Sequence, residues 1–82
     1  MQIKYFSWLK NITNKEFENI ENKNIKDVDS LTKYLCNKYP KMKEYLIKDQ
    51  VIRIAINLEY ASENIKLSKN DEIALFPPVS GG

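Results

Sequence analysis

Apolar and polar side chains alternate along the first part of the chain, and a two-residue period is typical of β-strands. Residues 2–8 follow this period, and residues 16–22 follow it with interruptions by Glu and Asn, which are poor strand formers. Between them, residues 9–13 have the length and composition of a short helical turn. The pattern predicts two neighbouring strands that form a hairpin.

A helical period follows in the middle of the chain. Asp27 is a suitable N-cap, Lys38 suits the negative pole of the helix dipole, and Pro40 ends the helix. The apolar positions that recur at helical spacing are Val28, Leu31, Leu35 and Tyr39. The sequence therefore predicts one amphipathic helix, and residues 42–46 indicate a further helical turn.

Two further strands are predicted after the helix. Residues 51–57 carry three isoleucines on one face, and residues 72–76 place Ile73 and Leu75 on one face and Ala74 and Phe76 on the other. The polar segment 57–70 is expected to be mostly loop, with Leu67 turned inward and a turn at its end.

This order of elements predicts an α+β domain in which one main helix crosses a mixed sheet of four or five strands. The β-grasp, or ubiquitin-like, architecture is the commonest one with that order and size. It would place the first and last strands side by side, as parallel neighbours in the centre of the sheet. Residues 1–76 form the expected domain, and residues 77–82 form an extended tail.

Composition narrows the range of functions. The chain has 82 residues, of which 43% are hydrophobic and 29% charged, as expected for one small globular domain. No apolar stretch approaches the ~20 residues of a membrane span, and no secretory signal or cysteine pair is present, so we expect a cytoplasmic protein. The net charge is +2, with lysines spread along the chain, which argues against nucleic-acid binding.

The tail carries the chemical signal. The only two glycines of the chain are its last residues, Gly81 and Gly82. Pro77 and Pro78 would stop the last strand and stiffen the start of the tail, because proline cannot donate a ladder hydrogen bond. A stiff exit that ends in residues without side chains can deliver a terminal carboxylate into a narrow channel. The alternative reading is a frayed terminus.

Other chemistry finds little support. The chain has no histidine and one cysteine, so neither a metal site nor a nucleophilic triad with a histidine base is expected. Cys36 is interpreted as a structural cysteine rather than a sulfur relay, since nothing nearby would lower the pKa of its thiol. Arg53 faces outward on its strand, either as a solvated charge or as a contact to acidic groups of a partner.

The last twelve residues, Asp71-Glu72-Ile73-Ala74-Leu75-Phe76-Pro77-Pro78-Val79-Ser80-Gly81-Gly82, resemble the C-terminal signature of the molybdopterin synthase small-subunit family. Ala55-Ile56-Asn57 and Tyr5-Phe6-Ser7 are also similar to segments of that family. The chain departs from the family at Trp8, where a polar residue is more common. It also has Asn14-Lys15 where the family has a glycine, although Asn tolerates a left-handed backbone.

The resemblance implies a sulfur carrier. In that family an adenylating enzyme uses ATP to activate the terminal glycine, here Gly82, and a sulfur-donating protein converts it to a thiocarboxylate. The tail, here Pro77, Pro78, Val79, Ser80 and Gly81, then threads into the large subunit. There the sulfur passes to cyclic pyranopterin monophosphate to build the molybdopterin dithiolene. The resemblance implies no bound cofactor, and it places the acid–base groups on the large subunit, so the chain would not be catalytic alone.

A docking surface is expected beside the tail. Phe6 and Phe76 fall on the outward phase of their strands, and neighbouring strands would bring them together. Tyr60 occupies a position at which the family contacts the large subunit. Phe6, Tyr60 and Phe76 are therefore the predicted partner interface, against the alternative that the phenylalanines only cover the sheet.

Three other functions remain open at this point. The first is a sulfur carrier for thiazole synthesis or tRNA thiolation, although such relatives generally lack the Phe-Pro-Pro-Val lead-in. The second is a ubiquitin-like modifier, whose activated tail would be attacked by lysine amines. The third is a binding domain whose C-terminus is only frayed.

Overall fold

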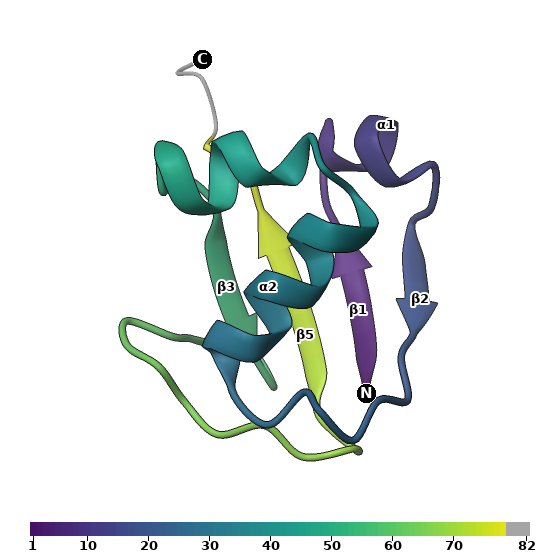
Figure 1. Ribbon diagram of the computed structural model, residues 1–82, viewed down its shortest axis with the longest axis vertical. Helices are drawn as coiled ribbons and strands as arrows, with labels where there is room; N and C mark the ends of the chain where they lie inside the picture. The colour runs from purple at the N-terminus through teal and green to yellow at the C-terminus, as the bar shows by residue number, and fades with distance from the viewer. Residues whose placement is uncertain (79–82) are drawn as a thin grey trace.

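A computed structural model describes residues 1–78 of the chain. Five strands form a single mixed sheet in the order β2-β1-β5-β3-β4, and helix α2 crosses one face of it (Figure 1). The elements are β1 (Gln2–Tyr5), α1 (Leu9–Thr13), β2 (Phe17–Asn19), α2 (Val28–Lys38), the π-helical turn η1 (Glu44–Lys48), β3 (Arg53–Ile56), β4 (Glu59–Tyr60) and β5 (Glu72–Phe76). The predicted α+β architecture is confirmed.

The first and last strands are parallel neighbours, as expected for a β-grasp. Ile3 lies opposite Ile73, and Tyr5 lies opposite Leu75, with β5 in the middle of the sheet. The other strand pairs are antiparallel. This pairing brings the N-terminal segment of the chain to the strand that leads into the tail.

The core lies between the sheet and α2. Inward side chains of β1 and β5 meet the apolar stripe of the helix, and the fully buried ones include Tyr5, Ile3, Leu31, Leu35, Ile73 and Leu75. Full burial of one such side chain contributes about 1.5–3 kcal/mol. Leu67 packs against this cluster, as predicted for the loop before β5.

Helix α2 begins with a capping box. The Asp27 carboxylate accepts a hydrogen bond from the Ser30 N–H at 2.8 Å, and the Ser30 hydroxyl oxygen accepts one from the Asp27 N–H at 3.0 Å. Two backbone donors that the helix leaves unpaired are satisfied in this way. The helix ends at Lys38, two residues before Pro40, so its predicted start and end are confirmed.

Three predicted boundaries need correction. The strand predicted over residues 2–8 ends at Tyr5, because Ser7 has a φ of 55° and turns the chain into α1. The strand predicted over residues 51–57 begins at Arg53. The segment 57–70, predicted to be mostly loop, contains the short strand β4, since Asn57 and Leu58 adopt positive φ angles of 49° and 72° and fold the chain back on β3.

The second strand is shorter than predicted, at Phe17–Asn19, but it does form the hairpin with β1. The turn before it keeps the left-handed geometry that a glycine would supply. Asn14 has a φ of 60°, and its N–H donates to the Lys10 carbonyl to end α1. The departure from the family pattern at Asn14 is therefore accommodated without glycine.

Candidate functional site

The root of the tail lies at the carboxyl end of β5. The strand ends at Phe76, Pro77 is buried, and Pro78 is exposed. The predicted tail residues Val79, Ser80, Gly81 and Gly82 lie outside the described residues. Figure 1 shows the end of β5 at the same end of the molecule as α1 and the helical turn that follows α2.

Beside this root, the three predicted interface aromatics lie together. The Phe6 and Phe76 rings are stacked, with centroids 4.5 Å apart and an interplanar angle of 16°. The Tyr60 ring meets Phe76 edge-on at 6.0 Å. We call Phe6, Tyr60 and Phe76 the aromatic patch. Phe6 is 40% exposed and Tyr60 is 63% exposed, so much of the patch faces solvent.

Strand pairing explains why these residues meet. Lys4 lies opposite Ala74 in the parallel pair β1–β5, which places Phe6 beside Phe76 two residues later. The Phe6 N–H also donates to the Leu75 carbonyl at 3.1 Å, which holds the chain against β5 just past the end of β1. Because side chains alternate across a strand, all three lie on the face of the sheet opposite α2.

Arg53 borders the patch. It lies opposite Phe76 in the β3–β5 pair, and its guanidinium carbon is 5.8 Å from the centre of the Tyr60 ring. The outward orientation predicted for Arg53 is confirmed. A cation held against an aromatic ring at the rim can pair with a carboxylate of a partner.

Asn57 fixes the other end of β5. Its side-chain oxygen accepts from the Glu72 N–H at 3.0 Å, and its side-chain amide donates to the Asp71 carboxylate at 2.9 Å. The same carboxylate accepts from the Ser68 N–H at 2.8 Å, and these bonds lower the pKa of Asp71. Asn57 and Asp71 thus hold the start of the strand that carries the tail.

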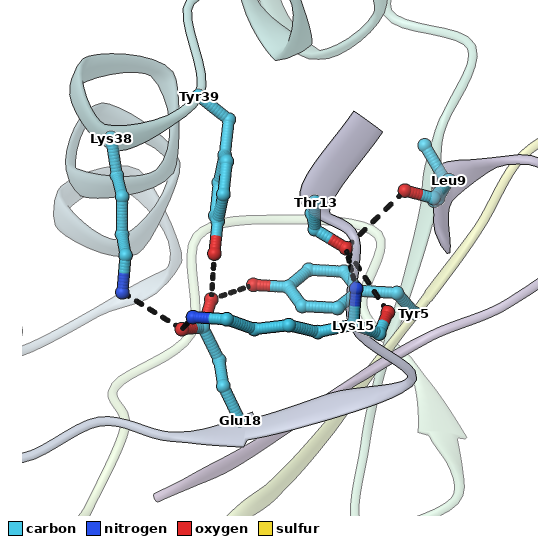
Figure 2. Close-up of polar contacts among 7 residues, drawn as sticks. All are labelled: Tyr5, Leu9, Thr13, Lys15, Glu18, Lys38 and Tyr39. Carbon is cyan, nitrogen blue, oxygen red and sulfur yellow. Dashed lines mark hydrogen bonds and ion pairs between the residues drawn. The ribbon is translucent and has the colours of Figure 1, made fainter. Parts of the chain in front are cut away.

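A second polar cluster, which the sequence reasoning missed, surrounds Glu18 on the face of the sheet that α2 covers (Figure 2). One carboxylate oxygen accepts from the Tyr5 hydroxyl and from the Tyr39 hydroxyl at 2.8 Å. The other accepts from Lys15 at 3.1 Å and from Lys38 at 2.8 Å. The side chain of Glu18 is 7% exposed. We call these five residues the Glu18 cluster.

The electrostatics of the cluster follow from its donors. Burial alone would raise the pKa of Glu18, but the hydrogen bonds from the lysines and tyrosines outweigh it and lower the pKa to about 2. Burial, together with the nearby Glu18 carboxylate, raises the pKa of Tyr5 and of Tyr39. The hydrogen bond to Glu18 raises the pKa of Lys38. Glu18 therefore stays ionised, and it ties β2 to the end of α2.

A signal for this cluster was present in the sequence. Glu18 has the inward phase of Ile20, while Phe17 and Asn19 have the outward phase. A carboxylate on an inward phase requires partners, because burying an unpaired charge is costly. Lys38 was interpreted only as a complement to the helix dipole, and its ion pair with Glu18 could not be seen before β2 and α2 were placed side by side.

Cys36 is buried, and burial raises the pKa of its thiol. Both observations agree with its interpretation as a structural residue. Among residues 1–78, no group of three or more metal-ligating side chains gathers at one place. Over the same residues, no helix combines the length and the apolar character needed to cross a membrane.

The sequence of this chain is similar to those of known proteins. The sequence model of the ThiS family matches residues 3–82. The molybdopterin synthase sulfur carrier subunit of Mycobacterium tuberculosis is 34% identical over 65 residues, which cover 79% of this chain and 75% of that protein. That of Dictyostelium discoideum is 44% identical over 55 residues, which cover 65% of this chain but only 60% of that protein.

Two solved structures have the same fold. SAMP1, the small archaeal modifier protein 1 of Haloferax volcanii, superimposes with a TM-score of 0.83 at 26% identity, covering 99% of this chain and 97% of that one. A chain in the complex of subunits 1 and 2 of the molybdopterin-converting factor from Helicobacter pylori gives a TM-score of 0.67 at 27% identity, with 99% and 96% covered.

Proposed function

This chain belongs to the ThiS family, and we propose that it carries sulfur for molybdopterin synthase on the carboxylate of Gly82. The relatives named sulfur carrier subunits of that enzyme support the proposal. So does the tail sequence, which has the proline exit and the double glycine of a carrier.

The proposed chemistry begins with activation of a poor electrophile. The Gly82 carboxylate attacks the α-phosphorus of ATP on an adenylating enzyme, and pyrophosphate leaves to give an acyl-adenylate. The terminal sulfur of a protein persulfide then attacks the acyl carbon, and AMP leaves. A second thiol attacks the resulting acyl disulfide, so that a protein disulfide forms and the thiocarboxylate is released. This sulfur is ionised and nucleophilic at neutral pH, as thiolates are.

The charged tail then enters the large subunit, where its sulfur attacks a carbon of cyclic pyranopterin monophosphate. A C–S bond forms, a C–O bond of that carbon breaks, and the carrier stays attached as a thioester. Two such transfers supply the two sulfurs of the dithiolene, and water releases each spent carrier as the carboxylate. The resemblance to the sulfur carrier subunits implies that the acid–base groups lie on the large subunit. On this proposal, the present chain contributes the nucleophile and the docking surface.

The observation that carries the proposal is the position of the aromatic patch. Phe76 is the last residue of β5 and stacks on Phe6, so an exposed apolar surface begins where the tail begins. Exposed aromatic clusters typically mark interfaces. A partner that covers the patch would receive the tail, as expected for the large subunit, and the subunit complex of the Helicobacter pylori relative supports such a partner.

A labelling experiment tests the carrier chemistry. The Cys36→Ser variant is incubated with ATP, a sulfur source and the adenylating enzyme of its host, and it is then treated with an alkylating reagent. Because this variant has no other thiol, we expect one label, on the C-terminal Gly81-Gly82 peptide, by mass spectrometry. The matched control, Cys36→Ser without Gly82, should take none. An unlabelled Gly82 in the presence of a competent enzyme would contradict the proposal.

A second function is favoured by one observation. The TM-score of 0.83 to SAMP1 shows that this fold also serves a protein whose name describes a modifier. On that reading, lysine amines rather than a persulfide attack the acyl-adenylate, and AMP leaves with formation of an isopeptide bond. The same incubation, run with a host extract, separates the two, since tryptic digestion of a modifier's products leaves residues 70–82 of this chain joined through Gly82 to lysines of other proteins.

A further inference from the structure

Arg53 is the only arginine among the 13 basic residues of the chain, and all the others are lysines. The two side chains are not interchangeable, because the planar guanidinium of arginine stacks on aromatic rings and can donate two parallel hydrogen bonds to one carboxylate. Arginine is also enriched in protein interfaces, whereas lysine is depleted there. The place of this one arginine in the fold therefore bears on what the chain binds.

Arg53 lies beside the aromatic patch, at the root of the tail. It is opposite Phe76, the last residue of β5, in the β3–β5 pair, and its guanidinium carbon is 5.8 Å from the centre of the Tyr60 ring. The residue is exposed. A guanidinium held over a ring in this way is already oriented, so it loses less conformational freedom when it binds an acceptor.

The charge of Arg53 is not balanced within the sheet. Because side chains alternate along a strand, three charged residues of the described strands share the outward face: Lys4, Arg53 and Glu72. Lys4 and Glu72 form an ion pair at 2.7 Å. Among residues 1–78, no carboxylate forms an ion pair with Arg53, and this includes Asp49 before β3 and Glu63 after β4. Arg53 therefore keeps its donors available to an acid of a partner.

We propose that Arg53 recognises the large subunit, and that its guanidinium pairs with one carboxylate of the surface that covers the aromatic patch. This inference rests on the proposed function. A partner that covers Phe76 and Tyr60 also removes water from Arg53, which lies opposite the first and over the ring of the second. A charge that loses its water without gaining an acceptor is strongly unfavourable. The covering surface must therefore supply an acid at this point, and a surface without one is rejected.

Because the chain has one arginine, the side-chain Nε–H of Arg53 gives a single resonance in protein labelled with ¹⁵N-arginine. The labelled chain is titrated with the purified, unlabelled large subunit of the same host. We expect this resonance to shift as the complex forms and its exchange with water to slow, since a carboxylate then accepts from the guanidinium. A resonance that is unmoved at saturation overturns the proposal, and so does one that moves with the adenylating enzyme and not with the large subunit.

Affinity measurements with variants give a second test. Arg53→Ala is expected to weaken binding of the large subunit about tenfold, and Arg53→Glu about a hundredfold at low salt, because it sets two acids against each other. Arg53→Lys keeps the charge but not the planar pair of donors, so its affinity should lie between those of Arg53→Ala and the parent chain. The matched control is Lys33→Ala, which removes an exposed cation of α2 on the other face of the sheet and should bind within about twofold of the parent chain.

The proposal and the function on which it rests fail in different ways. If Phe76→Ala weakens binding of the large subunit while Arg53→Glu, checked for folding by its unfolding curve, binds as the parent chain does, the pairing is overturned and the proposed function stands. If the parent chain does not bind the large subunit at all, the proposed partner is wrong, and the role of Arg53 is overturned with it. Recovery of the affinity of Arg53→Glu by one acid-to-arginine change in the large subunit would identify the paired carboxylate.

Discussion

The aromatic patch and the Glu18 cluster combine the same kinds of side chain on opposite faces of one sheet. Tyr5 and Phe6 are consecutive residues, and Tyr5 points into the Glu18 cluster while Phe6 points into the patch. In the cluster, every polar group has a partner and the carboxylate is buried. In the patch, the Phe6 and Tyr60 rings remain exposed, and the Arg53 guanidinium lies over the Tyr60 ring.

This difference separates stability from binding. A buried carboxylate with four donors ties elements of the fold together, and it offers nothing to a partner. Exposed stacked rings stabilise the chain little, but they hold apolar area in a fixed arrangement that a partner can cover. We therefore expect substitutions in the Glu18 cluster to lower stability and leave docking unchanged. Substitutions in the aromatic patch should weaken docking with little loss of stability.

The largest effect is expected in the Glu18 cluster. Replacing Glu18→Ala leaves two tyrosine hydroxyls and two lysines without their acceptor, and should lower the free energy of unfolding by about 3 kcal/mol. Urea unfolding of the variant and of the parent chain measures this difference in the free energy of unfolding. Binding of the large subunit by the folded variant should match that of the parent chain. A loss of affinity without a loss of stability would show that the Glu18 cluster takes part in docking.

The pH dependence of stability should also come from Glu18. Its pKa is about 2 in the folded chain and 4.5 in the unfolded reference, so its contribution is present above pH 4.5 and is lost as the pH falls towards 2. That shift corresponds to about 3 kcal/mol at most. Unfolding curves between pH 6 and about 2.5 should show a larger loss of stability in the parent chain than in Glu18→Gln, which keeps only the acid loss from other carboxylates with a lowered pKa, such as Asp27 and Asp71. Parallel curves for both proteins would refute the assignment.

A smaller effect is expected in the aromatic patch. Replacing Phe76→Ala should weaken binding of the large subunit about tenfold, or about 1.4 kcal/mol, while lowering stability by no more than about 1 kcal/mol. Phe17→Ala is the matched control, because Phe17 is an exposed phenylalanine of the same face on the edge strand β2. It should bind as the parent chain does, by calorimetric titration. Unchanged affinity for Phe76→Ala would remove its docking role.

Much of the fold could be predicted from local patterns. The helical stripe with Asp27 at its start and Pro40 after its end predicted α2, and the alternation of Ile73 and Leu75 with their neighbours predicted β5. The parallel pairing of β1 and β5 followed from the order of the elements. Strand β4 was missed, because a two-residue strand is too short to show a period, and its turn uses Asn57 and Leu58 rather than glycine.

The candidate site, too, could be predicted from the sequence only in part. The outward phases of Phe6 and Phe76 predicted that they would meet once their strands were neighbours, and the stacked rings confirm that arrangement. Their docking role stays a prediction, as do the roles of Pro77 and Pro78 and of the tail residues beyond them. The Glu18 cluster was not predicted, since its hydrogen bonds join residues 13, 20 and 21 positions apart in the sequence.

The sequence by itself determined the features that depend on neighbours along the chain: the helix cap, the strand phases, and a tail that ends in Gly81 and Gly82 after two prolines. Such features arise from backbone hydrogen bonding and side-chain periodicity over a few residues. Only the tertiary structure decided which side chains saturate Glu18 and that the Trp8 ring meets the Tyr45 ring edge-on. Those contacts require elements distant in sequence to pack at a fixed register, which burial of the whole core imposes and no local pattern encodes.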